Sequence, residues 1–435
     1  MEDVPLRADD LANLWVEDRC TPFHIALVGE LDPGPHRADD QGPARLASEL
    51  AARVHRVPAL SRRMVRRRLG TARPVWRDDP TDRPERHVHV VTLDPGQDFL
   101  GWAADRIPEP LDRSRPLWRA DVVGGLPGGR VGLLVVVHHV VADGLTGVAM
   151  ISRLLDGGPT AYAAESTPPP PPVGPKPVEL APAGPHAGAL AQVRAALADF
   201  GRPESSTSLP RRLGPGRRLV VVQERLEDLH ATSHALGATV NDLLIAAVTG
   251  GLRALLAARG DLRPDLVARA SVPVGRLGAG QTAGMLAAVL PVGLEDPRER
   301  LAAIVRETTA GKQRVRGGGG HVMGVVRLPV PLAHVAVRGL RLIAGNRIGL
   351  FVTDVPGPPG PLWLAGARLV RAVPVAPLVQ GVPLGVAALS YDGTLAIAVN
   401  ADAAVTDLDR FADGMRAEFD GLARAARVAA SSSPG

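Results

Sequence analysis

Residues 130–156 read RVGLLVVVHHVVADGLTGVAMISRLLD, and this stretch joins an apolar segment to two adjacent histidines and then to a helical pattern. The apolar density of residues 131–137 is typical of a central strand that is buried on both faces. Apolar residues then recur at helical spacing from Leu145 to Leu155. The stretch therefore predicts a buried strand, a turn that carries both histidines, and a helix.

Strand-like and helix-like segments alternate on both sides of this stretch, which favours a mixed α/β fold. The pattern predicts strands at 23–31 and 348–369, a helix at 42–57, a hairpin at 117–137, and the series strand, helix, loop, helix at 217–260. A second hairpin is expected at 384–402, turning at Asp392-Gly393.

Chain length and proline content predict two lobes. A chain of 435 residues exceeds the size at which a single core usually stops growing. The segment AESTPPPPPVGPKPVELAPAGP, residues 164–185, cannot hold a helix or a central strand. We therefore expect an N-terminal lobe at 1–163, a proline-rich crossover with one helix at 164–218, and a C-terminal lobe at 219–435.

Composition limits the class of protein. A hydrophobic content of 45% with 22% charged residues is typical of a globular chain. The single cysteine, Cys20, excludes an internal disulfide and a thiolate metal cluster. The N-terminus does not resemble a signal peptide, and no apolar run approaches the ~18 residues of a membrane-spanning helix. These features predict a cytoplasmic protein that is at most peripheral to a membrane.

The positive charge does not favour a nucleic-acid partner. The net charge is +5, but lysine occurs only at Lys176 and Lys312, and arginine is spread along the chain. The one dense cluster is SRRMVRRRL, residues 61–69. It is typical of a solvated face, and the alternative is a patch that binds anionic lipid headgroups or phosphates.

The two histidines are expected to have different roles. Successive side chains in a strand point to opposite faces, so His138 and His139 cannot easily converge on one metal ion. We predict no metal site. One imidazole should point into the protein and bond a structural partner, and the other should face a cavity at the end of the strand.

Asp143 and Gly144 follow where the strand gives way to a helix. Asp143 suits an N-cap, and its alternative role is a carboxylate that folds back to an arginine or to the imidazole. Gly144 allows the backbone to turn without a Cβ clash. The complete spacing His-His-x-x-x-Asp-Gly favours a functional site over an isolated pair of buried histidines.

The sequence resembles a known family at several places. HHVVADG matches the HHxxxDG signature of the superfamily that includes chloramphenicol acetyltransferase, carnitine acyltransferases and condensation domains. More of the chain is similar to the bacterial wax ester synthase/diacylglycerol acyltransferases: RCTPFHIALVGEL, PVWRDD, LDRSRPLWRADVV, LGATVNDLLIAAVTGGLR and VTDVPGPPGPLWLAGARL occur in the expected order. The resemblance runs from about residue 11 to residue 425.

The resemblance implies two similar chloramphenicol-acetyltransferase-like lobes with a channel at their interface. It also implies transfer of a fatty acyl group from acyl-CoA, as co-substrate without a bound cofactor, to diacylglycerol or a long-chain alcohol. His139 would be the general base, His138 and Asp143 would support the turn, and Gly144, Asn241 and Asp242 would shape the site. Lipid substrates further imply a membrane or lipid-droplet surface, with contacts at residues 62–68 and 328–345.

Departures from the family pattern leave two alternatives open. Val140 stands where the family has a small residue, and Thr353-Asp354 replaces Ser-Asn. We expect these changes to affect which substrates the protein uses. The alternatives are a condensation- or polyketide-type enzyme that takes its acyl group from a carrier protein, and a non-catalytic lipid-binding relative.

Overall fold

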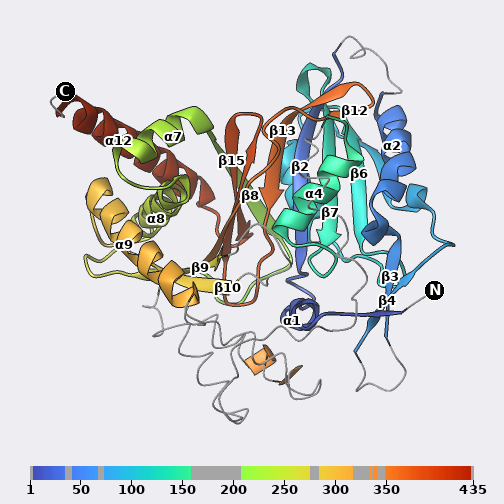
Figure 1. Ribbon diagram of the computed structural model, residues 1–435, viewed down its shortest axis with the longest axis horizontal. Coiled ribbons are helices and arrows are strands. Elements are labelled where there is room, and N and C mark those ends of the chain that lie inside the picture. Colours follow the sequence, from blue (N-terminus) through green and yellow to red (C-terminus); the bar gives the residue numbers. More distant parts are fainter. Residues whose placement is uncertain are drawn as a thin grey trace.

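The computed structural model describes residues 3–34, 42–66, 73–157, 207–274, 284–316, 334–335, 337–339 and 348–432. Two mixed sheets, each with its own helices, lie side by side (Figure 1). The predicted α/β class with two similar lobes is confirmed. The proline-rich segment at 164–185 lies outside the described residues.

The first sheet has six strands in the order β12-β13-β2-β7-β6-β5. They are β12 (Trp363–Leu364), β13 (Ala367–Val375), β2 (His24–Asp32), β7 (Val131–His138), β6 (Trp118–Gly124) and β5 (Val88–Thr92). Every residue of β7 is buried, as the apolar run predicts. The antiparallel pairing of β6 with β7 confirms the predicted hairpin.

The second sheet also has six strands, in the order β10-β9-β11-β14-β15-β8. They are β10 (Gly284–Leu290), β9 (Ala268–Val274), β11 (Leu350–Val355), β14 (Leu384–Tyr391), β15 (Thr394–Asp402) and β8 (Arg217–Arg225). The β14–β15 hairpin turns at Asp392 and Gly393, whose φ angles of 46° and 78° fit the predicted tight turn.

Helices pack around and between the two sheets. They are α1 (Ala8–Val16), α2 (Gly42–Arg53), α3 (Phe99–Arg106), α4 (Gly144–Leu154), α7 (Leu226–Ala235), α8 (Val240–Ala258), α9 (Pro297–Arg316) and α12 (Leu408–Ser432). Short 3-10 helices occur at Val54–Arg56, Pro58–Ser61, Pro84–Arg86 and Pro127–Gly129. A small third sheet pairs β1 (Val4–Pro5), β4 (Val75–Asp78) and β3 (Arg62–Val65).

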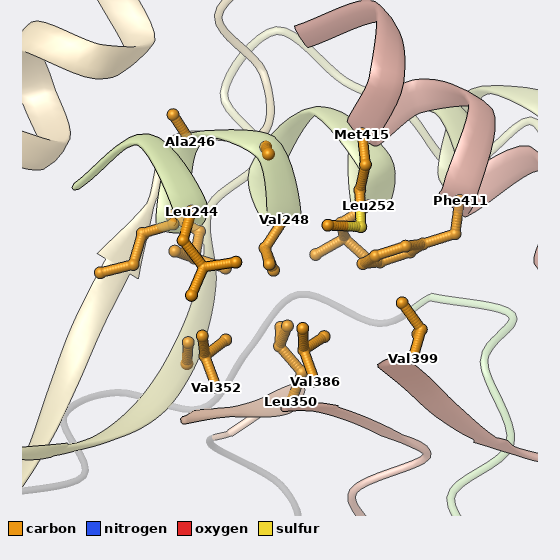
Figure 2. Packing of buried hydrophobic residues seen from close by; sticks show 14 of the residues in the cluster. Leu244, Ala246, Val248, Leu252, Leu350, Val352, Val386, Val399, Phe411 and Met415 are labelled. Atoms are coloured by element: carbon orange, nitrogen blue, oxygen red, sulfur yellow. The ribbon is translucent and has the colours of Figure 1, made fainter. Parts of the chain in front are cut away.

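The helix α8 forms the centre of the second lobe. Leu244 and Val248 lie over Val352 and Val386 of the sheet, and α12 covers the helix with Phe411 and Met415 (Figure 2). Among the described residues, α8 is the one helix that is long and apolar enough to cross a membrane, but 72% of its apolar window is buried inside the protein. Its apolar character therefore agrees with a core helix.

One connection crosses between the two lobes. Within residues 219–435, which were expected to form the C-terminal lobe, β13 pairs with β2 of the N-terminal sheet, and β12 pairs with β13 at the edge of that sheet. The crossing strands help to join the lobes: Val373 and Val375 of β13 share a buried cluster with Ala396 and Ala398 of β15. This exchange joins the two lobes through shared apolar packing.

Candidate active site

The two histidines lie where β7 ends, and the backbone separates them as the strand geometry predicts. The His138 N–H donates to the Leu117 carbonyl oxygen at 3.0 Å, on the β6 side. The His139 N–H donates to the Phe23 carbonyl oxygen at 2.8 Å, on the β2 side. The imidazoles therefore leave the strand in different directions and have different neighbours.

His138 points into the protein and is 2% exposed. Its Nδ1 accepts a hydrogen bond from the Val140 N–H at 3.0 Å, and its Nε2 lies 3.1 Å from Oε2 of Glu17. The other Glu17 oxygen pairs with Arg113. Burial, followed by the Arg113 guanidinium, holds the pKa of His138 well below its usual range. The ring is therefore neutral, and its Nε2–H donates to the carboxylate.

His139 faces a cavity and also contacts residues that precede β2. Its ring lies 4.9 Å from the Phe23 ring, and its Nδ1 is 3.2 Å from Nδ2 of Asn13 on α1. Burial lowers the pKa of His139, while an interaction with its own backbone and the charge of Asp143 oppose the shift. Its Nε2 has no hydrogen-bond partner among the described residues.

The cavity that His139 faces has a volume of about 710 Å³ and lies between the lobes. Its walls come from α1, α4 and the first-sheet strands β2, β7 and β13 on one side, and from β9, β11 and β14 of the second sheet on the other. Most of the side chains that line it are apolar. This size is within the range of cavities that enclose small-molecule ligands.

The helix α4 begins at the predicted turn. The Asp143 carboxylate accepts a hydrogen bond from the Thr146 N–H at 2.8 Å, so Asp143 is the N-cap of α4. The side chain is exposed and makes no bond to an arginine or to the imidazole in the described part of the chain. Gly144 lines the cavity, and a Cβ there would lie 2.9 Å from Val355 of β11. The two motif residues thus set the start of α4 against the second lobe.

Asn241 and Asp242 occupy a different place from the one expected. Neither residue lines the cavity. Asp242 forms a capping box with Thr239 at the start of α8 and accepts a hydrogen bond from the Thr308 hydroxyl at 2.8 Å. These contacts give Asp242 a structural role at a helix terminus.

The two departures from the family pattern lie in different places. Val140 is 4% exposed and packs in a small cluster with Leu6, Leu11 and Leu117, away from the cavity wall. Asp354 lines the cavity from β11. Burial raises the pKa of Asp354 to about 6. Only the second departure changes the chemistry of the cavity.

Sequence reasoning missed Asn13, Glu17 and Arg113. Asn13 lies on α1 and Glu17 caps its C-terminus, so the four-residue spacing gives the two histidines neighbours one helical turn apart. The four-residue spacing of these two polar side chains in an otherwise apolar segment was the feature of the sequence that could have indicated them. Their role could not be predicted from that spacing alone, because it depends on the packing of α1 against the end of β7.

The arrangement suits proton transfer by His139. In the described part of the chain no group of three or more His, Cys, Asp or Glu side chains could hold a metal ion. A neutral imidazole at the wall of an apolar cavity can accept a proton from a bound hydroxyl group. A second neutral histidine, bonded on both nitrogens, keeps the turn in place behind it.

Solved structures share this two-lobed fold. The wax ester synthase/diacylglycerol acyltransferase from Marinobacter aquaeolei VT8 superposes with a TM-score of 0.73 at 24% identity, covering 98% of this chain and 100% of that one. The first condensation domain of the calcium-dependent antibiotic synthetase gives a TM-score of 0.59 at 19% identity, covering 97% and 95% of the chains. At these identities the likeness shows the fold alone.

Sequence comparisons identify the family. The wax ester synthase/diacylglycerol acyltransferase catalytic domain matches residues 6–198 and 181–244, and the C-terminal domain of the same family matches residues 279–423. A Mycobacterium tuberculosis H37Rv protein named as a diacylglycerol O-acyltransferase is 30% identical over 417 residues, 84% of this chain and 82% of its own length. The chain belongs to the wax ester synthase/diacylglycerol acyltransferase family.

Proposed function

We propose that the protein transfers a fatty acyl group from acyl-CoA to the hydroxyl group of diacylglycerol, and also to long-chain alcohols, with His139 as general base. The observation that carries the proposal is the His139 imidazole at the wall of an apolar interlobe cavity of about 710 Å³. Family membership supports the same reaction class. The apolar walls suit an acyl chain and a lipid acceptor, because both bury hydrocarbon surface there.

In the proposed step, the acceptor oxygen attacks the thioester carbonyl carbon while Nε2 of His139 removes the hydroxyl proton. The tetrahedral intermediate then expels the CoA thiolate, which takes the proton back from the imidazolium. The products are an ester and free CoA, so no covalent enzyme intermediate is needed. General base catalysis of this kind typically contributes about 10²–10⁴-fold.

The position of Nε2 supports this assignment of the base, because Nε2 has no hydrogen-bond partner among the described residues and is open to a ligand. The lone pair lies on Nε2 when the Asn13 amide turns its oxygen, rather than Nδ2, toward Nδ1 and accepts the Nδ1 proton. His138 and Glu17 hold the turn, and Asp143 and Gly144 position α4 beside the cavity.

Purified protein should be assayed with palmitoyl-CoA and either 1,2-dioleoylglycerol or 1-hexadecanol, measuring both CoA release and ester formation. Ester formation with a free acyl-CoA supports the proposal. Turnover that requires an acyl group on a carrier protein would support the condensation-type alternative. Tight binding of lipid without CoA release would support the non-catalytic alternative.

We also propose that the protein works in the cytoplasm at a membrane or lipid-droplet surface, because its acceptors are water-insoluble. Of the arginine cluster, Arg62 and Arg63 form ion pairs with Asp78 and Asp79, which reduces the free positive charge. Any electrostatic contribution should therefore be modest. Co-sedimentation with liposomes of increasing anionic lipid content, at low and high salt, measures it directly.

A further inference from the structure

Asp354 lies on the part of β11 that borders the cavity. β14 pairs with β11 along its whole length, from Leu350 to Val355, but β9 pairs with it only at Leu350 and Phe351. Residues from both faces of β11 beyond this point line the cavity. Asp354 shares the face of Val352, which packs beneath Leu244 of α8 (Figure 2). The carboxyl group is therefore at the rim of the second lobe's core, with access to the cavity.

The carboxyl group of Asp354 lacks a partner in the described part of the chain. No hydrogen bond or ion pair reaches it, and burial alone raises its pKa to about 6. Its neighbours along the wall, Val352 and Val355, are apolar. At neutral pH the group is still largely ionised, and its side chain is only partly buried where it borders the cavity. A ligand that fills the cavity without a donor would take water from the carboxylate, which is costly. A ligand that supplies a donor at this place would relieve that cost.

We infer that Asp354 determines acceptor specificity by accepting a hydrogen bond from a second polar group, a hydroxyl or an amino group, on the acceptor beside the hydroxyl that is acylated. This inference rests on the proposed function and narrows its substrate class. A plain alcohol or diacylglycerol would leave the carboxylate unpaired in the occupied cavity. Sites that hydrogen-bond a substrate group discriminate strongly against analogues that lack it.

The inference assigns the hydrogen-bond donor to the acyl acceptor rather than to acyl-CoA. The phosphate groups of acyl-CoA are negatively charged, and a nearby carboxylate repels them. A hydroxyl or amino group on the acceptor is compatible with the negative charge, and a protonated amine complements it. The amide of an asparagine could bond a hydroxyl group but would not attract a cationic amine.

Competition between acceptors of equal chain length tests the inference. Palmitoyl-CoA is supplied with 1-hexadecanol, 1,2-hexadecanediol or 2-amino-1-hexadecanol, and kcat/KM is measured for each acceptor. The wild type should prefer the diol and the amino alcohol over hexadecanol by about tenfold, the effect of one hydrogen bond to a charged group. Asp354→Asn should reduce the preference for the amino alcohol by about tenfold or more. Asp228→Asn, the same change at an exposed position on α7, should leave both ratios unaltered.

The outcomes separate this inference from the proposed function. Equal kcat/KM ratios in the wild type and Asp354→Asn would overturn the role of Asp354 while acylation of hexadecanol still supports the enzyme. If Asp354→Asn changes only the KM of palmitoyl-CoA, the hydrogen-bond donor to Asp354 belongs to the thioester substrate. That result would overturn the inference that Asp354 recognises the acyl acceptor. No turnover with any acceptor would contradict the proposed function, and the inference would fail with it. Asp354→Ser gives the same comparison if the asparagine variant does not fold.

Discussion

The end of β7 and the start of α8 carry the two motifs expected to form the site, and the structure uses them differently. His139 and Gly144 line the interlobe cavity, whereas Asp242 is buried in a capping box that fixes a helix. Both regions place polar groups at the end of a strand or the start of a helix. Only the end of β7 lies at the junction of the two lobes. A motif at the terminus of a helix or strand therefore reaches the substrate only if that terminus faces the interlobe cavity.

Removing the imidazole of residue 139 should have the largest effect on activity. His139→Ala removes the proton acceptor from the cavity wall, so turnover of palmitoyl-CoA should fall about 10²–10⁴-fold. The melting temperature should stay close to that of the wild type, because the ring borders a cavity and makes few bonds. A variant with unaltered turnover would remove His139 from the mechanism.

Replacing His138 should chiefly reduce stability. His138→Ala leaves the Glu17 carboxylate and the Val140 N–H without their partner, a loss of roughly 1–3 kcal/mol in the free energy of unfolding. Activity should fall because the turn that holds His139 loosens. Thermal melts and turnover measured on the same sample distinguish the two histidines. A fully stable but inactive variant would give His138 a direct role in the reaction.

The start of α8 offers the contrasting case. Asp242→Ala removes the side chain that bonds Thr239 and Thr308, so the free energy of unfolding should fall by about 0.5–2 kcal/mol. At temperatures where the variant is folded, kcat/KM should stay within about threefold of the wild type, a change of less than about 0.7 kcal/mol. Asp242→Asn is the matched control of equal shape. A tenfold loss of kcat/KM with a normal melting temperature would mean that this helix start shapes the site after all.

Local features were predictable from the sequence because they depend on neighbouring residues. The strand at β7, its hairpin with β6, the turn at Asp392-Gly393 and the N-cap at Asp143 follow from apolar spacing and turn chemistry. The prediction that one histidine points inward and the other faces a cavity follows from the alternation of side chains along a strand.

Features that depend on tertiary contact could not be predicted. Asn13 and Glu17 meet the histidines across separations of 126 and 121 residues, and nothing in the local sequence indicates that pairing. The exchange of β13 into the first sheet is a property of topology, which apolar periodicity does not encode. The family resemblance grouped Asn241 and Asp242 with the site, but neither residue lines the cavity. Their distance from it depends on tertiary packing, which the local sequence does not reveal.

The contact between Asn13 and His139 should control the pH dependence of turnover. Burial lowers the pKa of His139 below its usual value of about 6.5, so the neutral base persists, and kcat/KM should hold, as the pH falls through about 6.5. Asn13→Asp places a carboxylate beside Nδ1, which stabilises the imidazolium and raises this pKa by about one unit or more. The acidic limb of the kcat/KM profile should move to higher pH. Asn13→Ala should lower kcat without that upward movement, and an unchanged profile in both variants would exclude Asn13 as a positioning residue.

The smallest effect is expected at Asp143, the motif residue that the structure exposes. An N-cap position accepts asparagine as well as aspartate. The free energy of unfolding of Asp143→Asn should therefore change by less than about 0.5 kcal/mol, whereas Asp143→Ala, which cannot cap α4, should lose about 1 kcal/mol.

Because the Asp143 charge opposes the lowering of the His139 pKa, the asparagine variant should also keep its activity to a slightly lower pH. Thermal melts and pH profiles of the two variants decide whether Asp143 acts through the helix terminus. An asparagine variant as damaged as His138→Ala would show instead that the carboxylate charge itself holds the turn together.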